Sequence, residues 1–172
     1  MKNAKTISTA IEINASKEMV WETLYTRFGE NYLFNPNLTG SHFTKGNAGE
    51  VGCERECQID SKTNIRERIT NAIELKQFTL EVIGGNMPMV KEVQVDIKLS
   101  PLAANKTKVL LDASFTTSPA FMAALMKMPF KKMFVNLLIG LKYYLETGKP
   151  VSKNTFKPVA KAYKQLQPSQ SF

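Results

Sequence analysis

The chain has 172 residues, of which 43% are hydrophobic and 22% are charged, and its formal net charge is +8. This length and composition are typical of a single soluble globular domain with a sizeable core. They exclude a membrane-spanning helix, because no apolar run approaches the ~20 residues that a span requires.

The first elements are a strand and two short helices. Residues 5–14 alternate apolar and polar side chains, which predicts a half-buried β-strand. Ser16 then stands where an N-cap is favoured, and the apolar residues from Val20 to Phe28 follow helical spacing. We expect a second short helix around residues 32–36, ended by Pro36.

A long series of strand-like segments follows. Alternating patterns predict strands over residues 41–45, 51–59, 65–69, 78–83, 92–99 and 109–115, with turn residues between them. Each segment has one apolar face. We therefore expect a single curved antiparallel sheet that is covered on one side.

Two charged residues stand on the apolar faces of this predicted sheet. Arg55 shares its face with Cys53 and Cys57, and Glu67 lies between two isoleucines. The polar segment 60–64 predicts a hairpin turn that places Cys57 opposite Glu67, so that Arg55 and Glu67 are diagonal neighbours. A buried ion costs several kcal/mol unless it is paired. The two residues form either a bridge within the core or a polar site inside a cavity.

A long helix should provide the cover of the sheet. Ser118 and Pro119 predict its cap and its first position, and Gly148 marks its end. Pro129 should kink it near the middle. Its first half is rich in methionine, which favours either plain core or an adaptable ligand-binding wall.

The two cysteines and the single histidine define no metal site. Cys53 and Cys57 would be about 13 Å apart on a strand, which is too far for a disulfide. We therefore expect both cysteines to be small buried hydrophobic residues. His42 on a short strand is more typical of the surface. We expect no metal and no cofactor. The N-terminus has no apolar signal core, so we expect a cytoplasmic protein.

The tail from residue 149 to 172 is strongly basic. It holds five lysines and no acidic residue, so it contributes +5 of the net charge. Lysines could draw the tail to anionic lipid, but we expect it to be solvated or loosely packed on the domain. Nucleic-acid binding is not expected, because the body has no focused basic face.

The order strand, two short helices, six strands and long C-terminal helix resembles the helix-grip fold of the START-related superfamily, often called SRPBCC. Within it, the sequence is similar to the polyketide cyclase/dehydrase-like branch. The residues that carry this resemblance are 11–21, 49–55, 67–69, 101–109 and 141–148. It implies an α+β domain over residues 1–148 with an internal cavity between the concave sheet and the long helix, and it leaves 149–172 outside as a basic tail.

Three functions remain open at this stage. The first is a non-enzymatic carrier or sensor of a small apolar or amphipathic molecule. The second is a cyclase or dehydratase that acts on a polyketide-like or aromatic substrate, and the third is a module that contacts membranes through its tail. The predicted ligand-binding residues are Cys53, Arg55, Cys57, Glu67, Phe78, Leu80, Val95, Leu111, Met122, Met126 and Phe130, and no catalytic residue is assigned. The ligand's identity and the oligomeric state do not follow from the sequence.

Overall fold

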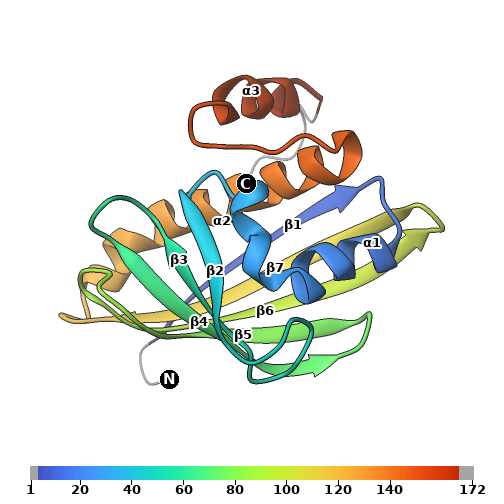
Figure 1. Cartoon of the computed structure of the whole chain (residues 1–172). Helices are drawn as coiled ribbons and strands as arrows, with labels where there is room; N and C mark the ends of the chain where they lie inside the picture. Colours follow the sequence, from blue (N-terminus) through green and yellow to red (C-terminus); the bar gives the residue numbers. More distant parts are fainter. Residues whose placement is uncertain (1–3, 167–172) are drawn as a thin grey trace.

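Seven antiparallel strands form one curved sheet along a long helix (Figure 1). The computed structural model describes residues 4–166. β1 pairs with β7, and the other strands follow in chain order, so that the sheet reads β1-β7-β6-β5-β4-β3-β2. The predicted α+β class and the single antiparallel sheet are confirmed. The strands are β1 (Lys5–Ile13), β2 (Gly40–Lys45), β3 (Glu54–Gln58), β4 (Asn64–Ile73), β5 (Gln77–Gly85), β6 (Val90–Ala103) and β7 (Lys106–Thr117).

Three short helical turns connect β1 to β2. They are α1 (Lys17–Trp21), the π-helical turn η1 (Glu22–Thr26) and the 3-10 turn η2 (Phe28–Leu33). The Ser16 hydroxyl accepts a hydrogen bond from the Met19 N–H at 3.3 Å, as expected of an N-cap. The second helix, η2, begins earlier than residue 32. The N–H groups of Phe34 and Asn35 bond back to the Asn31 carbonyl, which closes the turn before Pro36.

The long helix α2 (Met122–Thr147) begins later than Ser118. The Ser118 N–H donates to the Met89 carbonyl at 2.8 Å, which extends the strand pairing beyond β7, and the N-cap residue is Phe121, whose side chain makes no capping hydrogen bond. The helix is continuous through Pro129 and ends at Gly148, which has the expected left-handed conformation. The predicted kink stays a prediction. No helix within residues 4–166 is long and apolar enough to cross a membrane.

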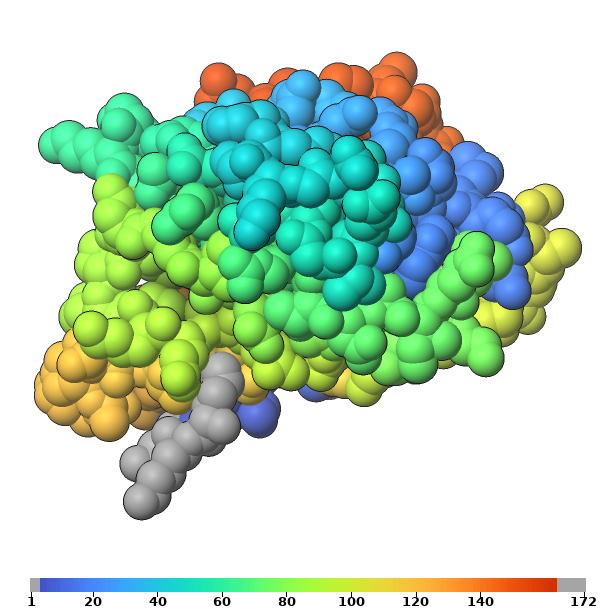
Figure 2. All heavy atoms as spheres, turned by 60° about the horizontal axis from the view of Figure 1, so that its bottom comes forward, coloured from blue at the N-terminus to red at the C-terminus, as the bar shows by residue number. Residues whose placement is uncertain are grey.

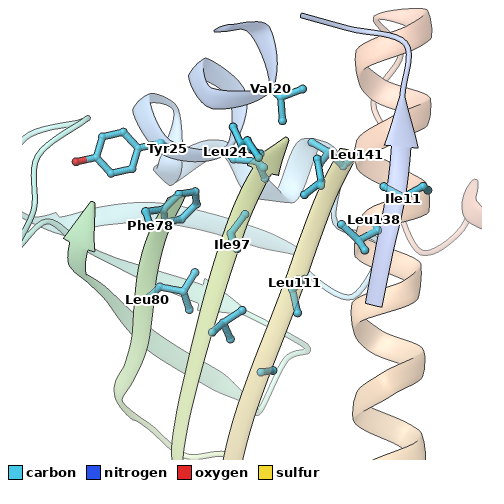
Figure 3. Close-up of a cluster of buried hydrophobic side chains, with 14 of the residues drawn as sticks. Ile11, Val20, Leu24, Tyr25, Phe78, Leu80, Ile97, Leu111, Leu138 and Leu141 are labelled. Atoms are coloured by element: carbon cyan, nitrogen blue, oxygen red, sulfur yellow. The ribbon is translucent and has the colours of Figure 1, made fainter. Parts of the chain in front are cut away.

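The core lies between the concave face of the sheet and the helices. Figure 3 shows Phe78, Leu80, Ile97 and Leu111 on the neighbouring strands β5, β6 and β7. Leu138 of α2 lies beside β1 in the same view. The first turns of α2 lie next to the turn between β5 and β6, at one end of the molecule (Figure 2). This first half of α2 is its less covered half, because Met128, which lies in it, is 69% exposed.

Part of the basic tail is packed onto the domain, so of the two expectations for it, solvated or loosely packed, the solvated one is wrong for this part. Val151 is only 2% exposed, and its N–H donates to the Leu33 carbonyl at 2.8 Å. The helix α3 (Phe156–Leu166) then places Phe156, Val159 and Tyr163 against the core cluster. Apolar side chains three and four residues apart give this helix one face to bury, which explains why it packs.

Candidate functional site

Arg55 and Glu67 lie directly opposite each other on β3 and β4. The Arg55 Nε and Nη2 atoms are both 2.7 Å from the Glu67 Oε2 atom, and the two residues are 5% and 9% exposed. The expected inward direction of both side chains is therefore confirmed. The expected diagonal register is wrong, because Cys57 lies opposite Ile65 and not opposite Glu67.

The turn between β3 and β4 explains this difference in register. The Asp60 carboxylate accepts hydrogen bonds from the backbone N–H groups of Lys62 and Thr63, and the Ile59 N–H donates to the Thr63 carbonyl. This aspartate-capped turn is tighter than a connection spanning residues 60–64. Pairing therefore resumes at Asn64, opposite Gln58, and Arg55 comes to face Glu67.

Arg55 contacts Phe28 as well as Glu67. Its Nη1 atom donates to the Phe28 carbonyl at 2.6 Å, and its Cζ atom lies 3.7 Å from the centre of the Phe28 ring. Burial by itself would lower the pKa of Arg55, but the facing charge of Glu67, the interaction with Cys57 and the hydrogen bonds with both residues together outweigh it, so the pKa is raised. Arg55 therefore stays protonated, and each of its three nitrogens contacts a protein oxygen.

Glu67 has one carboxylate oxygen committed to the protein and one available. Oε2 accepts from Arg55 and lies 3.4 Å from the Cys57 thiol. No residue in the described part of the chain donates to Oε1. Glu67 is among the residues that line an internal cavity. The register of β4 on β5 also shifts between Arg66 and Glu67, and such bulges redirect side chains near binding sites.

An internal cavity of about 110 Å³ lies between the sheet and α2. Eight of the eleven predicted ligand-binding residues line it, and they come from the five strands β3 to β7 and from α2. They are Arg55, Cys57, Glu67, Phe78, Leu80, Val95, Leu111 and Phe130. One end of the cavity is polar and the remainder is apolar. The structure thus brings most of the predicted residues together, and their binding of a ligand stays a prediction.

Three predicted residues lie elsewhere. Cys53 is buried, but it precedes β3 and packs beneath Gly46, because residues 51–53 form a turn and not the first part of a strand. Met122 and Met126 are half-buried on the first turns of α2 and do not reach the cavity. The helix α2 begins at Met122 and not near Ser118, and the first of its residues to line the cavity is Phe130.

The polar end of the cavity also includes residues that the sequence did not indicate. Asn31 of η2 is 5% exposed, and its Oδ1 atom lies 4.0 Å from the Cys57 sulfur. Its Nδ2 atom has no acceptor among residues 4–166. Asn35 and Asn37 line the same region, where the Asn37 side chain donates to Asn35 and to the Met133 carbonyl. A single 3-10 turn is too short to show a periodic pattern, so these residues gave no signal.

Both cysteines behave as buried hydrophobic residues, as predicted. They are free, and burial raises the pKa of each thiol. His42 is exposed on β2 and does not line the cavity. Among the described residues, no three His, Cys, Asp or Glu side chains are grouped closely enough to hold a metal ion.

Comparison with known proteins gives a structural likeness only. No protein-family model and no curated protein matches the sequence. The structure is similar to a START superfamily protein from Mycobacterium smegmatis, with a TM-score of 0.71 and 15% identity over 84% of this chain and 99% of that one. It is also similar to the ginseng major latex-like protein 151 from Panax ginseng, with a TM-score of 0.66 and 12% identity over 83% and 97%.

A third similar structure is the protein XoxI from Bacillus cereus, with a TM-score of 0.65 and 20% identity. The match covers 83% of this chain and 96% of the XoxI chain. The shared features are the seven-stranded curved sheet, the short helices after the first strand and the long C-terminal helix. The chain therefore has the helix-grip fold of the START-related superfamily.

Proposed function

We propose that the protein binds a small, largely apolar molecule that presents a polar group to one end of the internal cavity, and that it does so without catalysis. The observation that carries this proposal is the division of the cavity wall. Apolar side chains from β5, β6, β7 and α2 surround most of the space, while Glu67 and Asn31 place polar atoms without protein partners at one end. Such walls, mostly apolar with few polar groups, are typical of ligand sites.

The polar end indicates which chemical group the ligand offers. The charge of Arg55 is already paired with Glu67, and each of its three nitrogens contacts an oxygen of Glu67 or Phe28, so it is a less favourable partner for an anion. The available groups are the acceptor Oε1 of Glu67 and the donor Nδ2 of Asn31. A hydroxyl group can donate to the first and accept from the second. We therefore infer a hydroxylated ligand in place of a carboxylate at this end.

The cavity, at its present volume, limits the size of the ligand that it can hold. About 110 Å³ is smaller than the roughly 300–1,000 Å³ of typical ligand pockets. A molecule of one aromatic ring fits this space, and a larger one requires the walls to move. Met87 and Met133 line the cavity, and unbranched thioether side chains adapt their shape at low cost.

The test is binding of p-cresol, measured by isothermal titration calorimetry. Wild-type protein should bind it, and Leu80→Trp, which fills the cavity, should abolish binding. Leu102→Trp is the matched control, because Leu102 is exposed on β6 and does not line the cavity. Thermal unfolding should show that both variants are folded. Equal binding by the Leu80→Trp variant, or no binding of p-cresol and no co-purified ligand in native mass spectrometry of the wild type, would refute the proposal.

A further inference from the structure

A second hollow lies on the outside of the domain, between α2, α3 and the β3–β4 turn. Its volume is about 970 Å³. The helix α3 lies next to α2 (Figure 1) and outside the part of the chain that carries the family resemblance. It contributes Phe156, Lys157, Ala160 and Lys161 to the lining of the hollow. Much of its surface is apolar, from Pro36, Ile59, Met133, Val135, Ile139, Phe156 and Ala160.

Four lysines surround this groove. They are Lys132 of α2, Lys153 before α3, and Lys157 and Lys161 of α3. None of them forms an ion pair with an acidic side chain between residues 4 and 166. The one acidic residue of the groove is Asp60, whose carboxylate is bound by the N–H groups of the β3–β4 turn. The first turn of α3 also has no acidic residue. The groove therefore has an excess of positive charge above an apolar floor.

The groove and the internal cavity share part of their walls. Asn37, Ile59 and Met133 line both spaces, so a single layer of side chains separates them. The Asn37 side chain fastens this layer by donating to the Met133 carbonyl at 2.9 Å. Movement of the Met133 side chain alone changes no backbone hydrogen bond. A chain lying on the floor of the groove can thus reach the cavity at this point.

We propose that this groove binds the anionic head of a single-chain amphiphile whose other end enters the cavity between Asn37, Ile59 and Met133. The proposal rests on the proposed function, and it adds the ligand class. The ligand has a carboxylate or phosphate at its outer end, an apolar middle, and a hydroxyl at the inner end beside Glu67. Charge complementarity supports the head, because four lysines face a groove that contains one carboxylate, that of Asp60.

The experiment compares two ligands that differ in one end group, 10-hydroxydecanoate and 1,10-decanediol. Both present a hydroxyl to the cavity, and only the acid presents a charge to the groove. The test variant replaces Lys132, Lys153, Lys157 and Lys161 by Gln. The matched control replaces Lys5, Lys76, Lys91 and Lys108 by Gln, because these are exposed lysines outside the groove and the net charge changes equally.

Wild-type protein and the control variant should bind the acid about tenfold more tightly than the diol. The groove variant should lose this preference while its affinity for the diol stays within about twofold. Equal affinity of the wild type for both ligands would overturn this inference alone, and so would an equal loss of acid binding in the control variant. If the wild type binds neither ligand but still binds p-cresol, this inference alone falls; if it binds none of the three, the proposed function falls as well. Binding to phosphatidylglycerol vesicles without binding of the free acid would overturn the inference and assign the lysines to a membrane surface.

Discussion

Gly140 of α2 lies against the backbone carbonyl of Phe34, so closely that a Cβ atom at residue 140 would be 2.0 Å from the carbonyl oxygen. This is the point where the long helix rests on the segment after η2. Phe34 and its neighbours Asn35 and Asn37 line the cavity. The glycine therefore sets the separation between the two elements that close the site, because only a residue without a Cβ permits this approach.

Gly140→Ala should destabilise the protein in spite of a better helix propensity. Alanine favours a helix over glycine by ~1 kcal/mol. The new Cβ, however, forces α2 and residues 34–36 apart, and we expect a net loss of about 2 kcal/mol or more in the free energy of unfolding. Urea unfolding measures it. Lys127→Ala, at an exposed position of the same helix, is the control and should change stability by less than about 0.5 kcal/mol. An unchanged Gly140→Ala variant would contradict the packing described.

Removal of one partner of the buried ion pair should be far more damaging than removal of both. Arg55→Met leaves the Glu67 carboxylate buried without its cation, and Glu67→Leu leaves the guanidinium unpaired. Each single change should cost about 3–5 kcal/mol of unfolding free energy, whereas the double variant should recover most of this loss. Chemical denaturation of the four proteins gives the coupling energy. Additive losses in the double variant would show that the two charges are stabilised independently.

The sheet could be predicted from the sequence because each strand carries a period-two pattern with one apolar face. The inward direction of Arg55 and Glu67 followed from the same pattern. The register did not, because it depends on hydrogen bonds within the turn that residue types alone do not specify. The Asp60 carboxylate accepts from two N–H groups and tightens the connection, which shifts Arg55 from diagonal to directly opposite Glu67.

The candidate site was predicted only where regular elements supply it. The strand residues Phe78, Leu80 and Leu111 line the cavity because alternation fixes their direction. Asn31 was missed because η2 is one irregular turn, and its position depends on tertiary packing. The packed helix α3 was also missed. Its lysines dominated the interpretation of the tail, although its apolar residues have the spacing of a buried helix face.

The two buried thiols should make the protein less stable at alkaline pH. Burial raises the pKa of Cys57 and Cys53 in the folded state, whereas in the unfolded chain a thiol titrates near 8.5. The unfolded state therefore loses protons first. The stabilising contribution is complete below about pH 8.5 and falls as the pH rises further, by up to about 1.4 kcal/mol per pH unit for each thiol.

Urea unfolding between pH 7 and 10 measures this dependence. Cys57→Ala should reduce the slope of stability against pH above pH 8.5, even though it lowers stability at neutral pH through the small cavity that it leaves. Slow modification of the native protein by a thiol reagent, and fast modification after unfolding, should accompany it. A variant with an unchanged slope would mean that Cys57 loses its proton as readily in the folded state as in the unfolded one.

Recognition of a hydroxyl group at the polar end can be tested with two ligands of nearly equal shape, p-cresol and p-xylene. Glu67 Oε1 and Asn31 Nδ2 can both bond to the cresol hydroxyl, and the methyl group of xylene would leave both atoms unsatisfied. We expect wild-type protein to prefer p-cresol by about tenfold. Asn31→Leu should remove most of this preference by weakening cresol binding, with xylene affinity kept or improved, because leucine is apolar and of similar size. Calorimetric titration of both ligands into both proteins decides it. A preference that survives in the variant would show that Asn31 does not contact the ligand, and Glu67 would then be the sole partner of the hydroxyl.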